Sequence, residues 1–226
     1  MKRVLILVEG QTEETFVRDI LGPHLLTAEI FIRAILISTK RIKSGEKFKG
    51  GVTSYPQVRR EVWNLLNDTG AAGVTTMMDY YGLPTDFPGL ASQPRERSCY
   101  ERVTHLEEAF REDIGHRMFL PYLSLHEFEA LLLVAPEEIE KASPGKPGAA
   151  RLIAEVARFG SPEEVNDGPE THPSARIRQA VPTFQKRLHG PVVASRIGLE
   201  AIRKRCRHFD DWLRRLENLP ATAASA

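Results

Sequence analysis

Residues 4–10 read Val-Leu-Ile-Leu-Val-Glu-Gly, an unbroken aliphatic run that stops at an acidic residue. A continuous apolar run of this kind is typical of a strand covered on both faces of a parallel sheet. The pattern predicts a second strand over residues 30–37 and a third over residues 73–78. It predicts helices over residues 12–21 and 55–66, in the two intervals between these strands. This alternation favours an α/β core with a largely parallel sheet flanked by helices.

The rest of the chain is predicted to be mainly helical. Residues 82–97 are rich in proline and glycine and are expected to form a long loop, which is often a functional feature in a compact domain. A helix is expected over residues 99–114 and a strand over residues 119–125. Another helix is expected to begin within residues 126–133, and helical patterns with breaks follow it.

The chain has 226 residues, of which 42% are hydrophobic and 27% charged, so an intrinsically disordered protein is excluded. We expect an α/β core over residues 1–135, a helical lobe packed on it over residues 136–219, and a disordered tail over residues 220–226. Cys99 and Cys206 have no CxxC spacing, which favours a reducing compartment. With no apolar run of membrane-spanning length, a cytoplasmic protein without a membrane segment is expected.

The net charge of +1 indicates nothing about partners, but the charges are unevenly distributed. Residues 40–51 hold five basic residues and one acidic residue, and residues 174–207 hold nine and one. Residues 101–170 hold fifteen acidic and seven basic residues. Either these are solvated faces, or the basic stretches follow the phosphates of a nucleic acid. The candidate nucleic-acid contacts are Lys40, Arg41, Lys43, Arg176, Lys186 and Arg203.

Acidic residues stand where predicted strands end. Glu9 follows the first strand, Glu13 comes four residues later on the expected helix, and Asp79 ends the third strand. Strand ends of an open parallel sheet line its ligand crevice, so these carboxylates are expected to converge. Crowded carboxylates with oxygen-only chemistry predict Mg²⁺ or Mn²⁺. The alternatives are a favourable helix-start charge for Glu13 and structural pairing with an arginine for Glu9.

A second acidic group, His126-Glu127-Phe128-Glu129, follows the predicted strand at residues 119–125. Because residue 130 is alanine, the HExxH motif of zinc proteases is absent. Glu127 and Glu129 cannot share one side of a helix, but both can reach inward at a strand-to-helix turn. His126 could cap the helix, bind a metal or donate a hydrogen bond to a phosphate. The alternative for all three is charge at a helix start.

Several other functions are disfavoured because their motifs are missing. The chain has no GxGxxG, no GxxxxGK[ST] and no GxSxG. Tyr80 and Tyr81 are possible nucleophiles, but tyrosines after a strand more often pack. Residues 166–173 have strong turn chemistry, although Glu170 and His172 could line a cleft.

Four motifs give the chain a resemblance to the Toprim fold, the catalytic core of topoisomerases, bacterial primases and several nucleases. Within that fold it most resembles a small family of bacterial Toprim-like proteins, related to the Toprim domains of the overcoming-lysogenisation-defect (OLD) nucleases. The motifs are Val8-Glu9-Gly10-Gln11-Thr12-Glu13, Met78-Asp79-Tyr80-Tyr81-Gly82-Leu83-Pro84, His126-Glu127-Phe128-Glu129-Ala130-Leu131 and Asn166-Asp167-Gly168-Pro169-Glu170.

The resemblance implies roles for three of these acids. In Toprim enzymes the first-strand glutamate, here Glu9, acts as general acid or base at the scissile phosphate. In OLD nucleases an acid four residues later, here Glu13, helps to bind metal. The later Asp-x-Asp motif holds Mg²⁺, and its first position here is Asp79.

The chain departs from the family pattern at the second aspartate of that motif, where it has Tyr81. This departure calls into question the affinity for metal and the activity. Asp86, or Glu127 and Glu129, are the candidates to complete the metal shell. Relatives of this kind are often encoded beside an ATPase of the OLD or structural-maintenance type in bacterial defence settings, so such a partner is expected in trans.

The sequence therefore favours a metal-dependent nuclease acting on DNA or RNA, with Glu9, Asp79 and Glu127 as catalytic residues and Glu9, Glu13, Asp79, Glu127 and Glu129 as metal ligands. The alternative is a non-catalytic Toprim-like binding module that docks on a partner ATPase or on nucleic acid. A third reading is phosphotransfer or phosphatase chemistry on a small nucleotide.

Overall fold

The fold was analysed in a computed structural model that describes residues 1–37, 54–145, 147–166, 168 and 170–220. It is a mixed α/β structure built on a parallel sheet in the order β2-β1-β3-β4, with β5 also pairing with β3. The predicted fold class, a largely parallel sheet flanked by helices with a helical C-terminal region, is confirmed. The strands are β1 (Lys2–Val8), β2 (Ile30–Leu36), β3 (Gly73–Asp79), β4 (Phe119–Leu120) and β5 (Leu123–Ser124).

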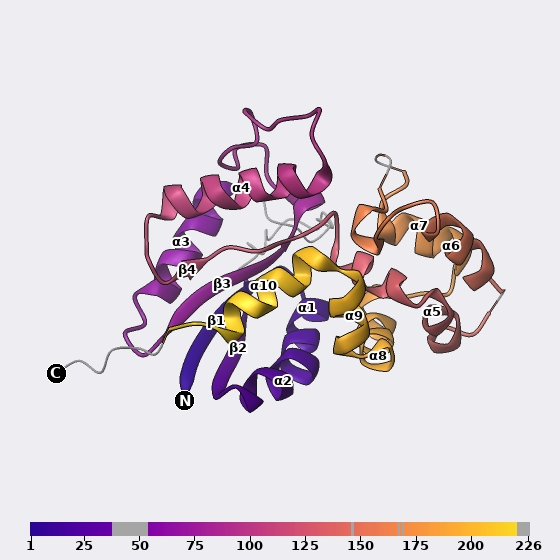
Figure 1. Cartoon of the computed structure of the whole chain (residues 1–226), viewed down its shortest axis with the longest axis horizontal. Coiled ribbons are helices and arrows are strands. Elements are labelled where there is room, and N and C mark those ends of the chain that lie inside the picture. Colours follow the sequence, from indigo (N-terminus) through magenta and orange to yellow (C-terminus); the bar gives the residue numbers. More distant parts are fainter. Residues whose placement is uncertain (38–53, 146, 167, 169, 221–226) are drawn as a thin grey trace, which may run out of the picture.

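Helices cover both faces of the sheet (Figure 1). Val4, Ile6 and Val8 of β1 belong to one hydrophobic core, whereas Leu5 and Leu7 belong to the other. This alternation explains why β1 is apolar at every position, as expected for a strand buried on two sides. The first core is covered by α1 (Gln11–Phe16), α2 (Gly22–Thr27) and α10 (Arg207–Glu217), and the second by α3 (Tyr55–Leu66) and α4 (Cys99–Ile114).

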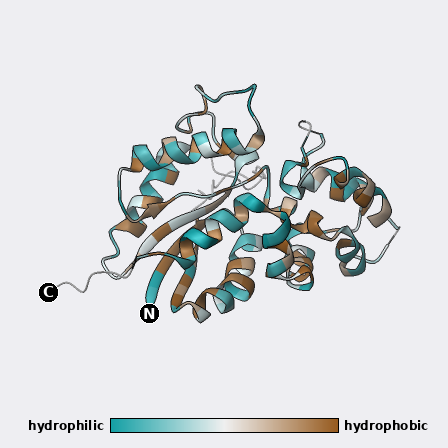
Figure 2. Ribbon diagram, in the orientation of Figure 1, coloured by the Kyte–Doolittle hydropathy of each residue, from teal (hydrophilic) through white to brown (hydrophobic). Residues whose placement is uncertain are grey.

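The helices of the C-terminal half that precede α10 lie beyond the carboxyl ends of the strands, and α10 returns across the sheet (Figure 1). Side chains of this half join the same hydrophobic core as β1 and α1, and Figure 2 shows the hydrophilic outer face of α10. The proposed boundary near residue 135 stays a prediction. The elements of the chain between residues 128 and 205 are the 3₁₀ segment η3 (Phe128–Val134), α5 (Pro136–Ala142), α6 (Ala149–Val156), η4 (Pro162–Glu164), α7 (Pro173–Ala180), α8 (Lys186–Ile197) and α9 (Leu199–Arg205).

The first helix is longer than the sequence predicts. It was expected to end near Gly22-Pro23, but helical structure continues through the π-helical segment η1 (Val17–Leu21) into α2. The Gly22 amide donates to the Val17 carbonyl five residues back. Pro23 follows this π-helical turn, so the residue that cannot donate a helical hydrogen bond stands next to the wider turn.

The region before the second acidic group also differs from expectation. The strand predicted over residues 119–125 is two short strands, because Pro121 between them cannot donate to a ladder. His126 adopts a left-handed backbone with φ of 62°, so the following helical segment starts only at Phe128 and is 3₁₀. Residues 83–98, after the short 3₁₀ turn η2 (Tyr80–Gly82), contain no helix or strand, as predicted.

Two predicted segments lie partly or wholly outside the described residues. They are the basic loop at residues 40–51 and nearly all of the tail predicted at residues 220–226. Within the described residues, no helix combines the length and the apolar character needed to cross a bilayer.

Helix α8 packs closely on α1 at Gly190. A Cβ atom at this position would lie 3.0 Å from Thr12 Cγ2 and 3.8 Å from Phe128 Cε1. The glycine therefore allows α8 to approach the first turn of α1, and this approach determines where the start of α8 lies relative to the strand ends.

The substitution Gly190→Val is expected to lower the free energy of unfolding by about 1–3 kcal/mol, because a branched side chain overpacks the contact with Thr12. Urea denaturation at equilibrium measures this change. Ser195→Val, on the exposed face of the same helix, is the matched control and should change stability by less than about 0.5 kcal/mol. Equal effects of the two substitutions would contradict the close packing.

Candidate metal and catalytic site

The pairing of β1 with β3 brings Glu9 and Asp79 together. Val8 lies opposite Met77 in the parallel ladder, so Glu9, the first residue after β1, lies near Asp79, the last residue of β3. The Glu9 Oε1 atom accepts a hydrogen bond of 3.0 Å from the backbone amide of Asp79. The predicted convergence of these two strand-end carboxylates is therefore observed, and an arginine partner for Glu9 is not found among the described residues.

The Asp79 carboxylate is oriented by the second acidic group. Its Oδ1 atom accepts a hydrogen bond of 2.8 Å from the amide of Phe128, the first residue of η3. The left-handed turn at His126 directs this amide toward β3, and the Tyr81 amide donates to the His126 carbonyl at 2.9 Å. The irregular backbone at residues 126–128 thus serves to join η3 to the end of β3.

Glu127 is held by the C-terminal half of the chain. Its Oε2 atom accepts a 2.8 Å hydrogen bond from the Ser174 amide and lies 3.0 Å from His172 Nδ1. The Ser174 hydroxyl donates to the other oxygen at 3.2 Å. Two described residues of the segment 166–173 therefore support the site: His172 contacts Glu127, and Asn166 Nδ2 donates to His126 Nδ1 at 3.1 Å.

Glu129 is the most deeply buried acid of the group, with an exposed fraction of 0%. Among the described residues, neither of its oxygens has a well-oriented hydrogen-bond donor; the ammonium of Lys186 lies 3.1 Å from Oε2. A buried carboxylate without donors is costly unless a cation or a proton compensates it.

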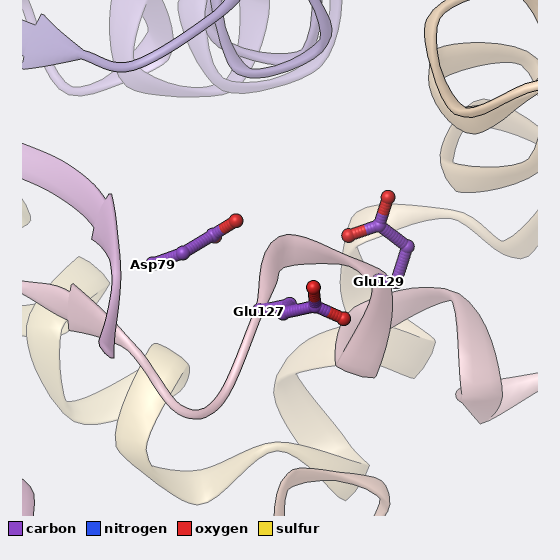
Figure 3. Close-up of side chains that lie close together, drawn as sticks. All are labelled: Asp79, Glu127 and Glu129. Atoms are coloured by element: carbon purple, nitrogen blue, oxygen red, sulfur yellow. The ribbon is translucent and has the colours of Figure 1, made fainter. Parts of the chain in front are cut away.

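Asp79, Glu127 and Glu129 offer one oxygen each within 4.8 Å of one another. Figure 3 shows the three side chains converging from the end of β3 and the start of η3. Glu127 has an extended backbone and Glu129 lies in the 3₁₀ segment η3. Both side chains point toward Asp79, as expected for residues at a strand-to-helix turn. Three carboxylates with no cysteine or histidine ligand among them fit a hard divalent ion such as Mg²⁺ or Mn²⁺.

Lys186, the first residue of α8, places its ammonium against two of these three acids and against Glu13. The Nζ atom lies 3.3 Å from Glu13 Oε1 and 3.4 Å from Asp79 Oδ2. Glu13 is itself buried in the first turn of α1. The sequence predicted Lys186 as a nucleic-acid contact, but its ion pairs with acids more than 50 residues away could not be read from spacing.

Burial and like charge raise the pKa values of the carboxyl groups. Burial, and next the charge of Asp79, raises the pKa of Glu9 to about 8. Burial raises the pKa of Glu129 to about 8 and that of Asp79 to about 6, although the nearby Lys186 charge opposes both shifts. Without a bound cation, protons therefore compensate part of the negative charge at neutral pH.

A cleft of about 430 Å³ lies at the carboxyl ends of the strands, with Glu129 buried behind its wall. Glu9, Glu13, Asp79 and Glu127 lie on its wall together with Tyr81, Lys186 and Arg187. A cleft with acids on its floor and cations from α8 on its rim suits an anionic substrate whose charge is bridged to the carboxylates by a divalent ion.

Other candidate residues lie elsewhere. Asp86 does not join the acids; its Oδ1 accepts a 3.0 Å hydrogen bond from the Tyr55 amide and caps α3. Arg176 pairs with Glu155 of α6, and Arg203 pairs with acids of α10. These arginines hold helices together, and their contact with nucleic acid stays a prediction. Lys40, Arg41 and Lys43 lie outside the described residues.

His126 is buried at the turn between β5 and η3, and its role as a hydrogen-bond donor to phosphate stays a prediction. Burial, together with the charge of Arg102, lowers the pKa of His126 to about 4. The ring is therefore neutral at physiological pH, and it accepts the hydrogen bond from Asn166.

The stability of the metal-free protein is expected to fall as pH rises from about 5 to 9. The pKa of Glu129 is raised from 4.5 to about 8 in the folded state, so the native protein retains a proton that the unfolded chain releases in this range. The same holds for Glu9. The stabilisation is complete below the unfolded pKa and is lost as pH passes through the folded value.

Urea denaturation in EDTA across this pH range measures the effect. Glu129→Gln should flatten the pH dependence, whereas Glu108→Gln, at an exposed position of α4, should leave it unchanged. A stability that does not vary over this range in the unsubstituted protein would contradict the buried carboxyl assignment.

Comparison with known proteins places the chain in a family. A family model described as a domain of unknown function, DUF4276, matches residues 8–217. No curated protein and no solved structure matches the chain significantly. The matched region runs from the last residue of β1 to the end of α10 and so includes every carboxylate of the cleft. The chain belongs to the DUF4276 family.

Proposed function

We propose that this chain is a Toprim-like, metal-dependent nuclease that hydrolyses phosphodiester bonds in DNA or RNA. The observation that carries the proposal is the convergence of Asp79, Glu127 and Glu129 within 4.8 Å, beside the strand-end Glu9. The resemblance of the four sequence motifs to Toprim proteins supports it, because three of the motifs line this cleft and the fourth contributes Asn166, which donates to His126.

The chain's own residues suit the chemistry of hydrolysis. Asp79, Glu127 and Glu129 would hold Mg²⁺ or Mn²⁺. Glu13 is linked to this group by Lys186, whose ammonium contacts Glu13, Asp79 and Glu129. When bound, the ion neutralises phosphate charge and activates water. As the water oxygen bonds to phosphorus and the leaving sugar oxygen departs, one proton must leave the water and one must reach the leaving group. Glu9, with a pKa of about 8, is suited to transfer a proton near neutral pH.

Substrate and partner are parts of the same proposal. Arg187, which lines the cleft beside Lys186, would contact phosphates, and the basic loop at residues 40–51 would add further contacts without sequence specificity. We propose a cytoplasmic protein of a bacterial defence system, acting with an ATPase of the OLD or structural-maintenance type.

The second candidate is a non-catalytic binding module that docks on such an ATPase or on nucleic acid. It is favoured by Tyr81, which stands at the second position of the Asp-x-Asp motif. The Tyr81 ring packs near His172, with centroids 5.3 Å apart, and so brings no carboxylate to the cleft. A binding module would keep the fold and the cleft but show no metal-dependent cleavage.

The nuclease proposal predicts cleavage of labelled DNA or RNA that requires Mg²⁺ or Mn²⁺ and is abolished by EDTA. Glu9→Gln keeps an oxygen that can accept from the Asp79 amide, yet removes proton transfer, and should lower the rate by about 10²–10⁴-fold. Glu108→Gln is the control and should retain full activity. Cleavage in EDTA, or cleavage unaffected by Glu9→Gln, would overturn the assignment.

Metal binding can be measured independently of cleavage. Mn²⁺ should raise the melting midpoint of the protein. At a free Mn²⁺ concentration of one hundred times the dissociation constant, binding adds about 2.7 kcal/mol to the free energy of unfolding. Glu129→Gln should lose most of this shift, because it removes a charged ligand from the buried end of the site, and Glu108→Gln should keep it. No Mn²⁺-induced shift in the unsubstituted protein would favour the non-catalytic binding module, which is expected to show no stabilisation by metal.

A further inference from the structure

Lys186 contacts carboxylates from three separate elements of the cleft. Its Nζ atom lies 3.1 Å from Glu129 Oε2, 3.3 Å from Glu13 Oε1 and 3.4 Å from Asp79 Oδ2. An ammonium group carries three donors, so the number of surrounding carboxylates equals the number of its hydrogens. This is the environment of a bound cation, supplied here by the chain itself.

The ion pairs differ from ordinary surface salt bridges. The side chains of Glu129, Glu13 and Asp79 are 0%, 4% and 15% exposed, whereas that of Lys186 is 38% exposed. The lysine therefore reaches from the rim of the cleft into the acidic floor. Removing one partner of such a buried arrangement leaves uncompensated charge, which is far more costly than breaking an exposed pair.

The position of Lys186 is set by its helix. It is the first residue of α8, and α8 is held against α1 by the close approach at Gly190. Glu13 lies in the first turn of α1. The packing that brings α8 onto α1 therefore also brings the ammonium onto the Glu13 carboxylate.

The acids of the cleft divide into two overlapping groups. Asp79, Glu127 and Glu129 present oxygens within 4.8 Å of one another, and Glu129 is buried without a well-oriented donor. Glu13, Asp79 and Glu129 surround Lys186. Asp79 and Glu129 belong to both groups, just as shared carboxylates bridge the two ions of a two-metal site, which lie about 3.5–4 Å apart.

We propose that Lys186 is a built-in cation in the second cation position of the cleft, so that the site binds one divalent ion and not two. This inference rests on the metal site of the proposed function and specifies its stoichiometry. The divalent ion is held by Asp79, Glu127 and Glu129. The ammonium stays beside Glu13, where it leaves no room for a second ion and repels one electrostatically.

The test is the stoichiometry of Mn²⁺ binding to the full chain, measured by calorimetry and by the electron paramagnetic resonance of bound Mn²⁺. The unsubstituted protein should bind one ion. Lys186→Met, which has similar length and no charge, should bind two, and the two ions should show spin coupling because they share carboxylates. Arg187→Met removes a cation from the same cleft and should still bind one.

Each result has a definite meaning. Two ions in the unsubstituted protein would overturn the inference, whether or not the variant folds. One ion in a folded Lys186→Met variant would also overturn it, while the proposed function would stand. If neither protein binds Mn²⁺, both the metal-dependent function and this inference are wrong.

Discussion

The parallel pairing of β1 with β3 is the constraint on which the candidate site depends. Parallel strands end at the same edge of a sheet, and the register of Val8 with Met77 brings Glu9 close to Asp79, two residues beyond Met77 at the end of β3. The hydrogen bond from the Asp79 amide to Glu9 follows directly from that register. Neither carboxylate needs a specialised loop to reach the cleft, because two ordinary buried strands deliver both of them.

The price of this arrangement is a group of acids that water cannot fully solvate. Burial raises the pKa values of Glu9 and Glu129 to about 8, so protons and the Lys186 ammonium compensate for missing solvation. Such buried acids lower the free energy of unfolding, and the same acids can bind a cation. This trade of stability for function is common at active sites. The irregular backbone at His126 belongs to the same arrangement, since its left-handed turn aims the Phe128 amide at Asp79.

Elements with a strong local signal could be predicted from the sequence, and elements set by distant contacts could not. The aliphatic run of β1 and the capping box of α4, in which Ser98 and Glu101 cap each other, are local features, and α4 was predicted at residues 99–114. The sequence does not predict that the helix continues past Pro23. A π-helical segment directly before the proline allows this continuation, and it has no clear sequence signal. The strand-end acids were found because strand ends define a crevice. The role of Lys186 was missed in part, because only the packing of α8 on α1 shows which acids its side chain reaches.

The helical C-terminal half completes the site as well as covering the sheet. Ser174 and His172 fix the Glu127 carboxylate, and α8 supplies the cation between Glu13 and Asp79. The strands alone would present Glu9 and Asp79 at an open edge, with no countercharge and with Glu127 free to rotate. The acids of the sheet and the residues that organise them therefore come from opposite ends of the chain, so the cleft exists in its final form only when both halves are folded together. The matched family region, residues 8–217, includes both the sheet and the residues that organise its acids.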